Sequence, residues 1–397
     1  MIIFKSNVDT TILAKSKWGA INIKLIKNEK YFCTTNFYAL LLFALESNNI
    51  KHGVNQIQIE KEKGYKYIDI TQKLSRINKY HINDIVNKKK EIKILIINGF
   101  VSGIGDNLVG LSALKIFHEE YKNKFDNITF DCYNENILRI YNTLAKYKLF
   151  NQYLSFPQKL ETLKTYDCIL DLDNVHEWTE FNNLPMIDCF LSIMGIDYKN
   201  IEPYRKKNTV TIDYNTYKNL NPIFKGIKYN NDSKLLLLQY DSSAKIRMIS
   251  NDYIVGIIDK ILSNSDYRII ILGDLKYEHP RLLKLKKYSQ TLDDFIYIIS
   301  ESDCAITTDT SAYHISDALN KPTVTLFTSI KPELRVKYYT NVKGILLSDP
   351  NHPIMGKFDS ANQVDLDYVN NLWENLDIQM VLNNLQNINQ DLFGHSV

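Results

Sequence analysis

The hydrophobic positions of this chain change period repeatedly between residues 91 and 205. Short apolar runs bounded by polar residues predict strands, at residues 92–97, 128–133 and 168–172. Apolar residues spaced three and four apart predict helices, after Asp106, at 136–144 and at 186–194. Strands that alternate with helices indicate a parallel sheet covered by helices. Residues 91–205 are therefore expected to form a Rossmann-like domain.

The same alternation returns between residues 232 and 347. Strands are expected at residues 235–239, 269–272, 305–307 and 323–327, and the end of a helix at 296–299. The polar residues 206–231, with a short strand expected at 209–212, are interpreted as the connection between two Rossmann-like domains. Residues 348–397 are expected to be helical, mainly over 366–385, and to pack back on the first domain.

Residues 1–90 differ from the rest of the chain in pattern and in charge. Strands are expected at residues 20–26, 56–60 and 65–70, and one helix is expected at residues 37–46. Residues 1–90 carry 16 Lys and Arg against 7 Asp and Glu, whereas the remaining residues carry 32 against 38. This basic surplus suits binding of an acidic partner, or peripheral contact with an anionic inner membrane. A solvated lysine-rich surface explains the same charge and stays open as the alternative.

Composition narrows the class of protein. The 397 residues are 45% hydrophobic and 23% charged, which indicates a globular protein of two or three domains. No apolar run approaches the roughly 20 residues that span a bilayer, and the N-terminus lacks the pattern of a signal peptide. The scattered cysteines form no Cys-x-x-Cys pair, which favours reduced thiols and disfavours a structural zinc site. We expect a cytoplasmic protein without a nucleic acid partner.

The first candidate site is the turn Gly103-Ile-Gly105-Asp106-Asn107, between a predicted strand and a predicted helix. It is not a dinucleotide fingerprint, because Leu108 stands where the third glycine belongs, and it lacks the Gly-Lys-Ser/Thr of a triphosphate loop. Its glycines let a ligand approach the backbone closely. Asp106 is then either a helix cap or a general base at the rim of a ligand site.

The second candidate site is the turn Asp309-Thr310-Ser311-Ala312, which follows a predicted strand and starts a helix. Backbone N–H groups and the positive end of the helix dipole suit such a turn to a phosphate or diphosphate. His314, one helical turn later, would add a second donor. Simple capping of the helix by a hydroxyl or carboxylate side chain is the alternative.

Together the two turns resemble the heptosyltransferase-like glycosyltransferases (glycosyltransferase family 9-like), over about residues 92–345. In that family a Gly-Asp pair heads a helix, as Gly105-Asp106 does here, and its aspartate is the proposed catalytic base. Residues 302–327 resemble the family's diphosphate signature Asp-Thr-Gly-x-x-His, with Ser311 in place of the glycine. The resemblance implies a GT-B fold, in which two Rossmann-like α/β domains face a cleft. The second domain is expected to hold a nucleotide sugar and the first an acceptor.

The resemblance also assigns residues around the donor. The family has a phosphate-binding lysine before a Trp-Pro pair that this chain lacks, so Lys245 and Arg247 are both candidates for that position. Glu278 is a candidate contact to the ribose. The other expected donor contacts come from the two turns, at Gly103, Gly105, Asn107, Asp309, Thr310, Ser311, Ala312 and His314.

The implied reaction is the inverting, metal-independent transfer of a sugar from a nucleotide diphosphate to a hydroxyl of a surface glycan or protein acceptor. ADP-heptose is the first donor to consider, and no cofactor beyond this co-substrate is expected. Asp106 would take the proton of the acceptor hydroxyl. Asp171-Leu-Asp173 is interpreted as the end of a first-domain strand rather than as a metal motif.

Two other classes of function stay open. A nucleotide-sugar epimerase would share the two-domain architecture and act on the donor alone. A non-catalytic nucleotide-sugar-binding protein is suggested by Ser311 and by the missing Trp-Pro. Relatives that modify autotransporters are expected to carry a cysteine-ligated iron, which the cysteine spacing of this chain does not support.

Overall fold

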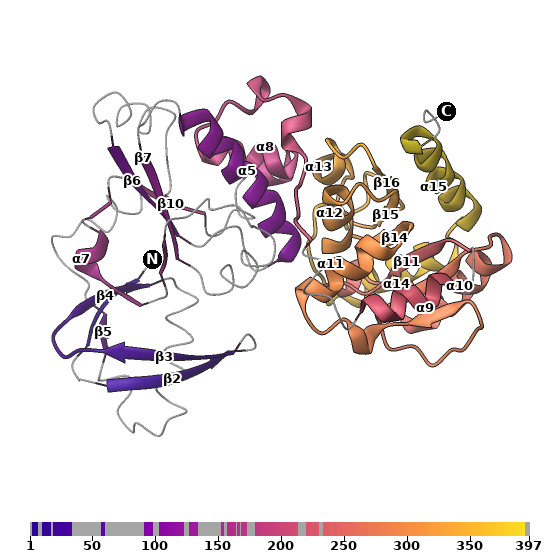
Figure 1. Cartoon of the computed structure of the whole chain (residues 1–397), viewed down its shortest axis with the longest axis horizontal. Helices are drawn as coiled ribbons and strands as arrows, with labels where there is room; N and C mark the ends of the chain where they lie inside the picture. Colours follow the sequence, from indigo (N-terminus) through magenta and orange to yellow (C-terminus); the bar gives the residue numbers. More distant parts are fainter. Residues whose placement is uncertain are drawn as a thin grey trace.

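The computed structural model places two α/β units side by side (Figure 1). The structure describes residues 2–6, 10–16, 19–33, 57–59, 91–97, 103–122, 127–133, 152–154, 157–163, 165–166, 168–172, 179–212, 220–229 and 233–393. Among these residues, no helix combines the length and the hydrophobicity that a bilayer-spanning segment needs.

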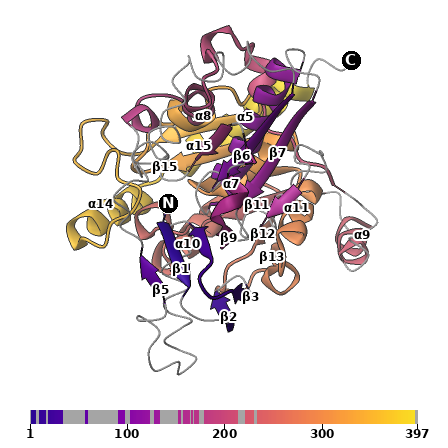
Figure 2. The ribbon, with the colours of Figure 1, turned by 90° about the vertical axis from the view of Figure 1, so that its left-hand side faces the viewer.

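The N-terminal residues form small antiparallel sheets. Their strands are β1 (Ile2–Ser6), β2 (Thr10–Ser16), β3 (Gly19–Leu25), β4 (Lys30–Cys33) and β5 (Ile57–Ile59). β2 and β3 are a hairpin, and the other sheet has the order β5-β1-β4-β9, where β9 is Gln158–Lys159. Figure 2 shows these strands beside the first parallel sheet. Because β9 comes from far along the chain, β4 is tied directly to the first Rossmann-like domain.

β3 and β5 agree with the strands predicted at 20–26 and 56–60. The helix predicted at 37–46 and the strand predicted at 65–70 lie outside the described residues, as does the helix predicted at 136–144.

The first Rossmann-like domain has a parallel sheet of the order β10-β6-β7-β8. Its strands are β6 (Glu91–Ile97), β7 (Asn127–Tyr133), β8 (Gln152–Leu154) and β10 (Cys168–Asp171), and its helices are α5 (Ile104–Lys122), α7 (Leu160–Leu163) and α8 (Met186–Ile193). Ile94, Leu95 and Ile96 on β6 are all buried, so both faces of this strand are covered. That is the burial expected of a strand inside a parallel sheet.

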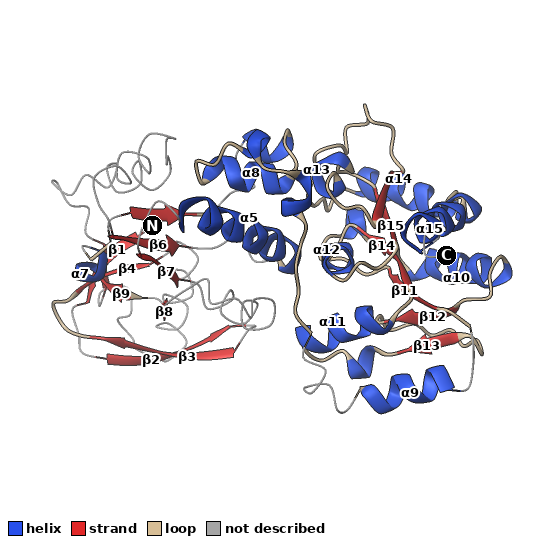
Figure 3. Ribbon diagram, turned by 45° about the horizontal axis from the view of Figure 1, so that its top comes forward, coloured by secondary structure: helices blue, strands red, loops and turns tan. Residues whose placement is uncertain are grey.

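The second domain is a larger parallel sheet of the order β13-β12-β11-β14-β15-β16. Its strands are β11 (Leu235–Gln239), β12 (Arg268–Ile271), β13 (Leu282–Lys284), β14 (Cys304–Thr308), β15 (Thr323–Phe327) and β16 (Val342–Leu346). Its helices are α9 (Asn221–Tyr229), α10 (Asn251–Ser263), α11 (Leu292–Glu301), α12 (Ser311–Ala318), α13 (Glu333–Val336), α14 (Gln363–Glu374) and α15 (Ile378–Phe393). Figure 3 shows helices on both sides of these strands, the doubly wound arrangement predicted from the alternation.

Two sequence predictions about this half are wrong. Residues 209–212 are not a strand, because the connection is anchored by side chains instead: Asp317 Oδ2 accepts from the Asn208 backbone N–H at 2.9 Å and from its side-chain amide at 3.0 Å. The C-terminal helices pack on the second domain, not on the first. Their apolar side chains, among them Trp373 and Leu382, join the core built on β11, β12, β14 and β15.

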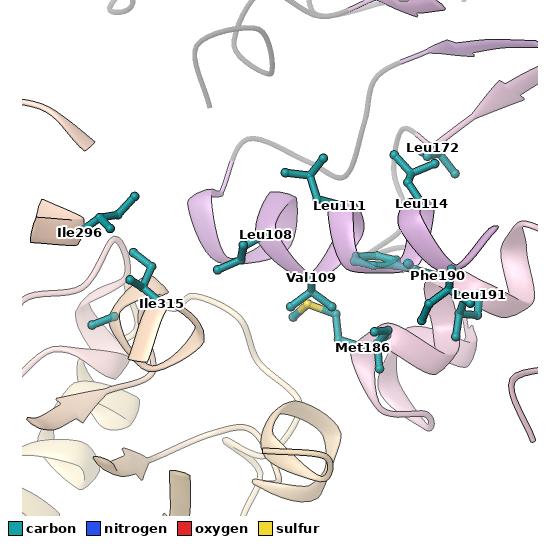
Figure 4. Packing of buried hydrophobic residues seen from close by; sticks show 14 of the residues in the cluster. Leu108, Val109, Leu111, Leu114, Leu172, Met186, Phe190, Leu191, Ile296 and Ile315 are labelled. Atoms are coloured by element: carbon teal, nitrogen blue, oxygen red, sulfur yellow. The ribbon is translucent and has the colours of Figure 1, made fainter. Parts of the chain in front are cut away.

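The two domains share one hydrophobic core. α5 of the first domain packs on α8 and also on α12 of the second domain. Figure 4 shows Leu108 on α5 turned toward Ile296 and Ile315 of the second domain, while Val109 points to Met186 on α8. This packing brings the start of α5 and the start of α12 to the same place.

Candidate active site

The two candidate turns line one cleft, with a volume of about 680 Å³. The first domain contributes residues 103–106 to its wall, and the second contributes Asp309, Thr310, Ser311, Tyr313 and His314. Further lining residues come from other segments, namely Phe181, Met186, Gln239, Asp241, Ser242, Ser243, Arg247, Phe295, Arg335 and Phe358. The carboxyl ends of the strands of both domains therefore open onto one space, as in other doubly wound folds.

The glycines of the first turn make room for particular side chains. A Cβ at position 103 would collide with Oδ2 of Asp106. At position 105 it would lie 2.6 Å from Cδ2 of His314, a residue of the other domain. Gly103 thus leaves space for the Asp106 carboxylate, and Gly105 lets the His314 ring reach the first domain.

Asn107 holds this turn together rather than lining the cleft. Its side-chain amide donates to the Gly103 carbonyl at 2.7 Å, and its backbone N–H donates to the same oxygen at 3.1 Å. The side chain is fully buried. Asn107 therefore supports the loop, and it is not among the residues that line the cleft.

Asp106 carries the carboxylate of the first turn. Burial raises its pKa above the usual value, and the nearby carboxylate of Asp309 acts in the same direction. The positive charges of Arg335 and Arg247 lower the pKa, with Arg335 the stronger of the two, and the residue's own backbone N–H also lowers it. A carboxylate at a helix N-terminus is ordinarily a weak base, but here burial opposes that effect.

The second turn is built by its own hydrogen bonds. Thr310 caps α12, because its Oγ1 accepts from the Ala312 backbone N–H at 3.2 Å. Asp309 is buried, and its two carboxylate oxygens are taken: Oδ1 accepts from the Tyr313 hydroxyl at 3.1 Å and Oδ2 from Arg247 at 3.3 Å. Ala312 is buried behind the cap, whereas Thr310 and Ser311 face the cleft.

The geometry separates the two candidate phosphate-binding cations. Arg247 lines the cleft, held by Asp309 and by a hydrogen bond from its Nη2 to Ser243 Oγ at 3.1 Å. Lys245 is exposed and is not part of the cleft wall. Of the two candidates, Arg247 is therefore the one that faces the cleft.

His314 is a neutral donor candidate. Burial lowers the pKa of its ring to about 3, with a smaller contribution from the charge of Arg335. Its Nδ1 lies 2.7 Å from the Tyr339 hydroxyl. Asn208 donates to the Tyr339 hydroxyl, so that hydroxyl is free to donate its own hydrogen to Nδ1 of His314. Nδ1 is then the acceptor, and the proton of the neutral ring is on Nε2. Nε2 then points its N–H toward the glycine turn of the first domain.

Arg335 is a cleft residue that the sequence reading did not single out. It is buried on α13, with its guanidinium carbon 4.9 Å from the centre of the Phe181 ring and 5.9 Å from that of Phe358. No motif marks it. The signal that could have found it is its position, a few residues after β15, since loops at the carboxyl ends of strands form the site in this fold.

Glu278 does not lie on the cleft. Its side chain is 87% exposed and forms an ion pair with Lys284. A second hollow of about 660 Å³ opens nearby, lined by Gly273, Asp274, Lys276, Lys284 and Lys286 among others. A Cβ at Gly273 would lie 2.7 Å from Oδ2 of Asp241, a residue of the cleft wall, so the second hollow adjoins the cleft.

The comparisons with known proteins agree with this arrangement. Residues 262–364 match the family model of glycosyltransferase family 9 (heptosyltransferase). That segment is similar to glycosyltransferase family 9 in sequence. It contains the second turn, the histidine and Arg335. No curated protein matches the chain in sequence.

Solved structures share the fold at low sequence identity. The ADP-heptose lipopolysaccharide heptosyltransferase II of E. coli is 12% identical with a TM-score of 0.52, over 76% of this chain and 99% of that one. A family 9 glycosyltransferase of Veillonella parvula is 9% identical with a TM-score of 0.52, over 76% and 98%. The iron-containing dodecameric glycosyltransferase TibC of enterotoxigenic E. coli is 11% identical with a TM-score of 0.51, over 78% and 79%.

The family match and the shared fold confirm three predictions made from the sequence. They are the resemblance to heptosyltransferases, the GT-B architecture and the class of enzyme, a glycosyltransferase.

Proposed function

We propose that the protein is an inverting glycosyltransferase that moves a sugar from a nucleotide diphosphate to an acceptor hydroxyl. One observation carries the proposal: the turn that bears Asp106 and the turn that starts α12 line the same cleft. A volume of about 680 Å³ is in the range of small-molecule sites. The transfer needs a carboxylate that can act as a base on one side of the sugar and an anion-binding turn on the other.

The donor diphosphate is proposed to lie at the start of α12. Thr310 and Ser311 face the cleft there, and the helix dipole favours a negative charge at that end. Arg247 lies beside them and can donate to phosphate oxygens. The nucleoside would extend from Asp241 toward the second hollow at Gly273 and Asp274.

The chemistry follows from the two walls of the cleft. The acceptor hydroxyl attacks the anomeric carbon from the side opposite the diphosphate, which inverts the configuration. The bond from that carbon to the phosphate oxygen breaks, and its electron pair stays on the diphosphate. Asp106 takes the hydroxyl proton, and its burial makes it a stronger base than an exposed aspartate. Neutral His314 can donate Nε2–H to the sugar or phosphate without adding charge.

The remaining parts of the proposal concern partners and place. ADP-heptose is the first donor to test, since the similar heptosyltransferase II is described with it. The acceptor is proposed to be a hydroxyl of a surface glycan or of a protein. We further propose that the enzyme works in the cytoplasm without a metal ion. The basic residues 1–90 would hold it against the acceptor or the inner membrane.

A ligand screen followed by product analysis tests the function. A ligand that binds only the folded protein raises its melting temperature, so nucleotide sugars with adenine, uracil and guanine bases are compared with their free nucleosides. The best binder is then incubated with and without glycan or protein acceptors from cell extracts. We expect transfer with inverted anomeric configuration, read by NMR of the product. Isomerisation of the donor without any acceptor would instead identify an epimerase.

A further inference from the structure

Arg335 is a cation of the cleft wall that the proposed mechanism leaves unused. Its guanidinium is held by two aromatic rings, Phe181 and Phe358, whose centres lie 5.7 Å apart. Phe181 belongs to the first domain, whereas Phe358 precedes α14 in the C-terminal part. A guanidinium over aromatic faces keeps its charge while the rings exclude water from around it. Arg335 is therefore fixed in place by both halves of the molecule.

The guanidinium has spare hydrogen-bonding capacity. Its one bond among the described residues runs from Nη1 to the Leu334 carbonyl at 3.2 Å, and no described carboxylate lies within ion-pair distance. Arg205, by contrast, pairs with Glu119 and Glu120. A buried cation without a counter-charge is unfavourable. An anionic ligand would supply what the protein does not.

The charge of Arg335 is felt at the centre of the site. It lowers the pKa of Asp106 more than the charge of Arg247 does, and it also lowers the pKa of His314 and of Tyr313. Arg335 also lines the same cleft as Asp106 and His314, where the bond to the sugar would break. Arg247, in contrast, shares its charge with Asp309.

We propose that Arg335 binds the phosphate that is bonded to the sugar and that leaves with the nucleotide. This inference rests on the proposed function. The diphosphate gains negative charge as its bond to the sugar breaks, and a planar guanidinium can donate to two of its oxygens at once. Arg247 steadies the diphosphate beside Asp309, and the otherwise unpaired charge of Arg335 meets the charge that develops. The residue is a specificity element for donors in which a diphosphate, not a monophosphate, joins the nucleoside to the sugar.

The test compares nucleoside diphosphates with the matching monophosphates. ADP with AMP, and UDP with UMP, are titrated against the full chain by calorimetry. The wild type is expected to prefer the diphosphate. Arg335→Met should reduce diphosphate affinity by about tenfold to a hundredfold and leave monophosphate affinity nearly unchanged, as for loss of a charge-assisted hydrogen bond. Lys337→Met removes an exposed positive charge two residues away and should leave both affinities as in the wild type.

Arg335→Gln repeats the prediction with a neutral polar side chain, in case the methionine variant does not fold. If the wild type binds no nucleoside diphosphate, the proposed function itself fails. If the wild type binds and both variants keep its preference, only the assignment of Arg335 fails. An equal loss for diphosphate and monophosphate also overturns it, because the residue would then only support the cleft.

Discussion

The two turns that meet across the cleft are built in opposite ways. In the first turn the missing side chains of Gly103 and Gly105 provide the space that Asp106 and His314 occupy. In the second turn, hydrogen bonds of Thr310 and the Asp309 carboxylate fix the backbone and the neighbouring side chains. The difference separates the two acids. Asp309 has both oxygens engaged, whereas the described residues give Asp106 only its own backbone N–H.

This comparison supports the proposal that Asp106 is the reactive carboxylate and that Asp309 organises the site. The Asp309 oxygens already accept hydrogen bonds from Tyr313 and Arg247, so they are not free to receive the proton of an acceptor hydroxyl. A buried carboxylate with few donors is a better proton acceptor. The four predictions below test this difference, beginning with the largest effect.

Replacing each acid by its amide should have different consequences. Asp106→Asn should lower the transfer rate by about a hundredfold to ten-thousandfold, the range of a general base, with donor affinity almost unchanged. Asp309→Asn weakens the contact that holds Arg247, so its main effect should be weaker donor binding. Steady-state kinetics and donor titration measure both. Wild-type transfer by the Asp106 variant would remove the residue from the chemistry.

The cation beside the second turn should matter more than its exposed neighbour. Arg247→Met should weaken nucleoside diphosphate binding by about tenfold to a hundredfold, because charge-assisted bonds to phosphate are lost. Lys245→Met should change it by less than about twofold, since a surface charge outside the cleft contributes little. Titration of both variants ranks them. The reverse order would return the lysine to the donor site.

Adding one methyl group to the first turn should disturb the second domain. Gly105→Ala places a carbon 2.6 Å from Cδ2 of the buried His314 ring, and overpacking of this kind costs about 1–3 kcal/mol. Gly226→Ala on α9 meets nothing within 4 Å and should stabilise the protein by about 0.5–1 kcal/mol, as expected for alanine in a helix. Denaturant unfolding compares the two. Equal stability of both variants would mean that His314 does not press on the glycine turn.

The pH profile should show the raised pKa of one acid and no titration of the histidine. A general base must be ionised, so kcat/KM should fall as pH drops through the pKa of Asp106, which burial places above the ordinary aspartate value of about 3.9. His314, with a pKa of about 3, is neutral above that limb and adds none near the ordinary histidine range. Arg335→Met removes a charge that lowers the Asp106 pKa, so the limb should shift to higher pH. A limb that disappears in a His314 variant would contradict this assignment.

The central strands of the parallel sheets could be predicted from the sequence because they are buried on both faces. Every residue of β14 and β15 is buried, and such short apolar runs between turn residues have few other places in a fold. β13 and β16, at the two edges of the second sheet, are less apolar and were not predicted. An edge strand has a sheet neighbour on only one side, so its pattern is weaker.

The wrong or missing predictions depend on partners that a pattern does not name. The helical period of residues 366–385 shows that one face is buried but not against which domain, and that choice was wrong. Arg335 was missed because its role depends on Phe181 and Phe358, far from it in sequence. Lys245 and Arg247 could not be separated, since only the fold shows which of them reaches the cleft.

The apolar cluster that joins α5 to α12 has a consequence for how the protein loses its structure. It contains side chains from both parallel sheets, for example Ile94 and Leu237, so neither Rossmann-like unit can be opened without exposing part of the other's interior to water. Melting of the two units is thereby coupled, and heating should disassemble them together in a single calorimetric peak.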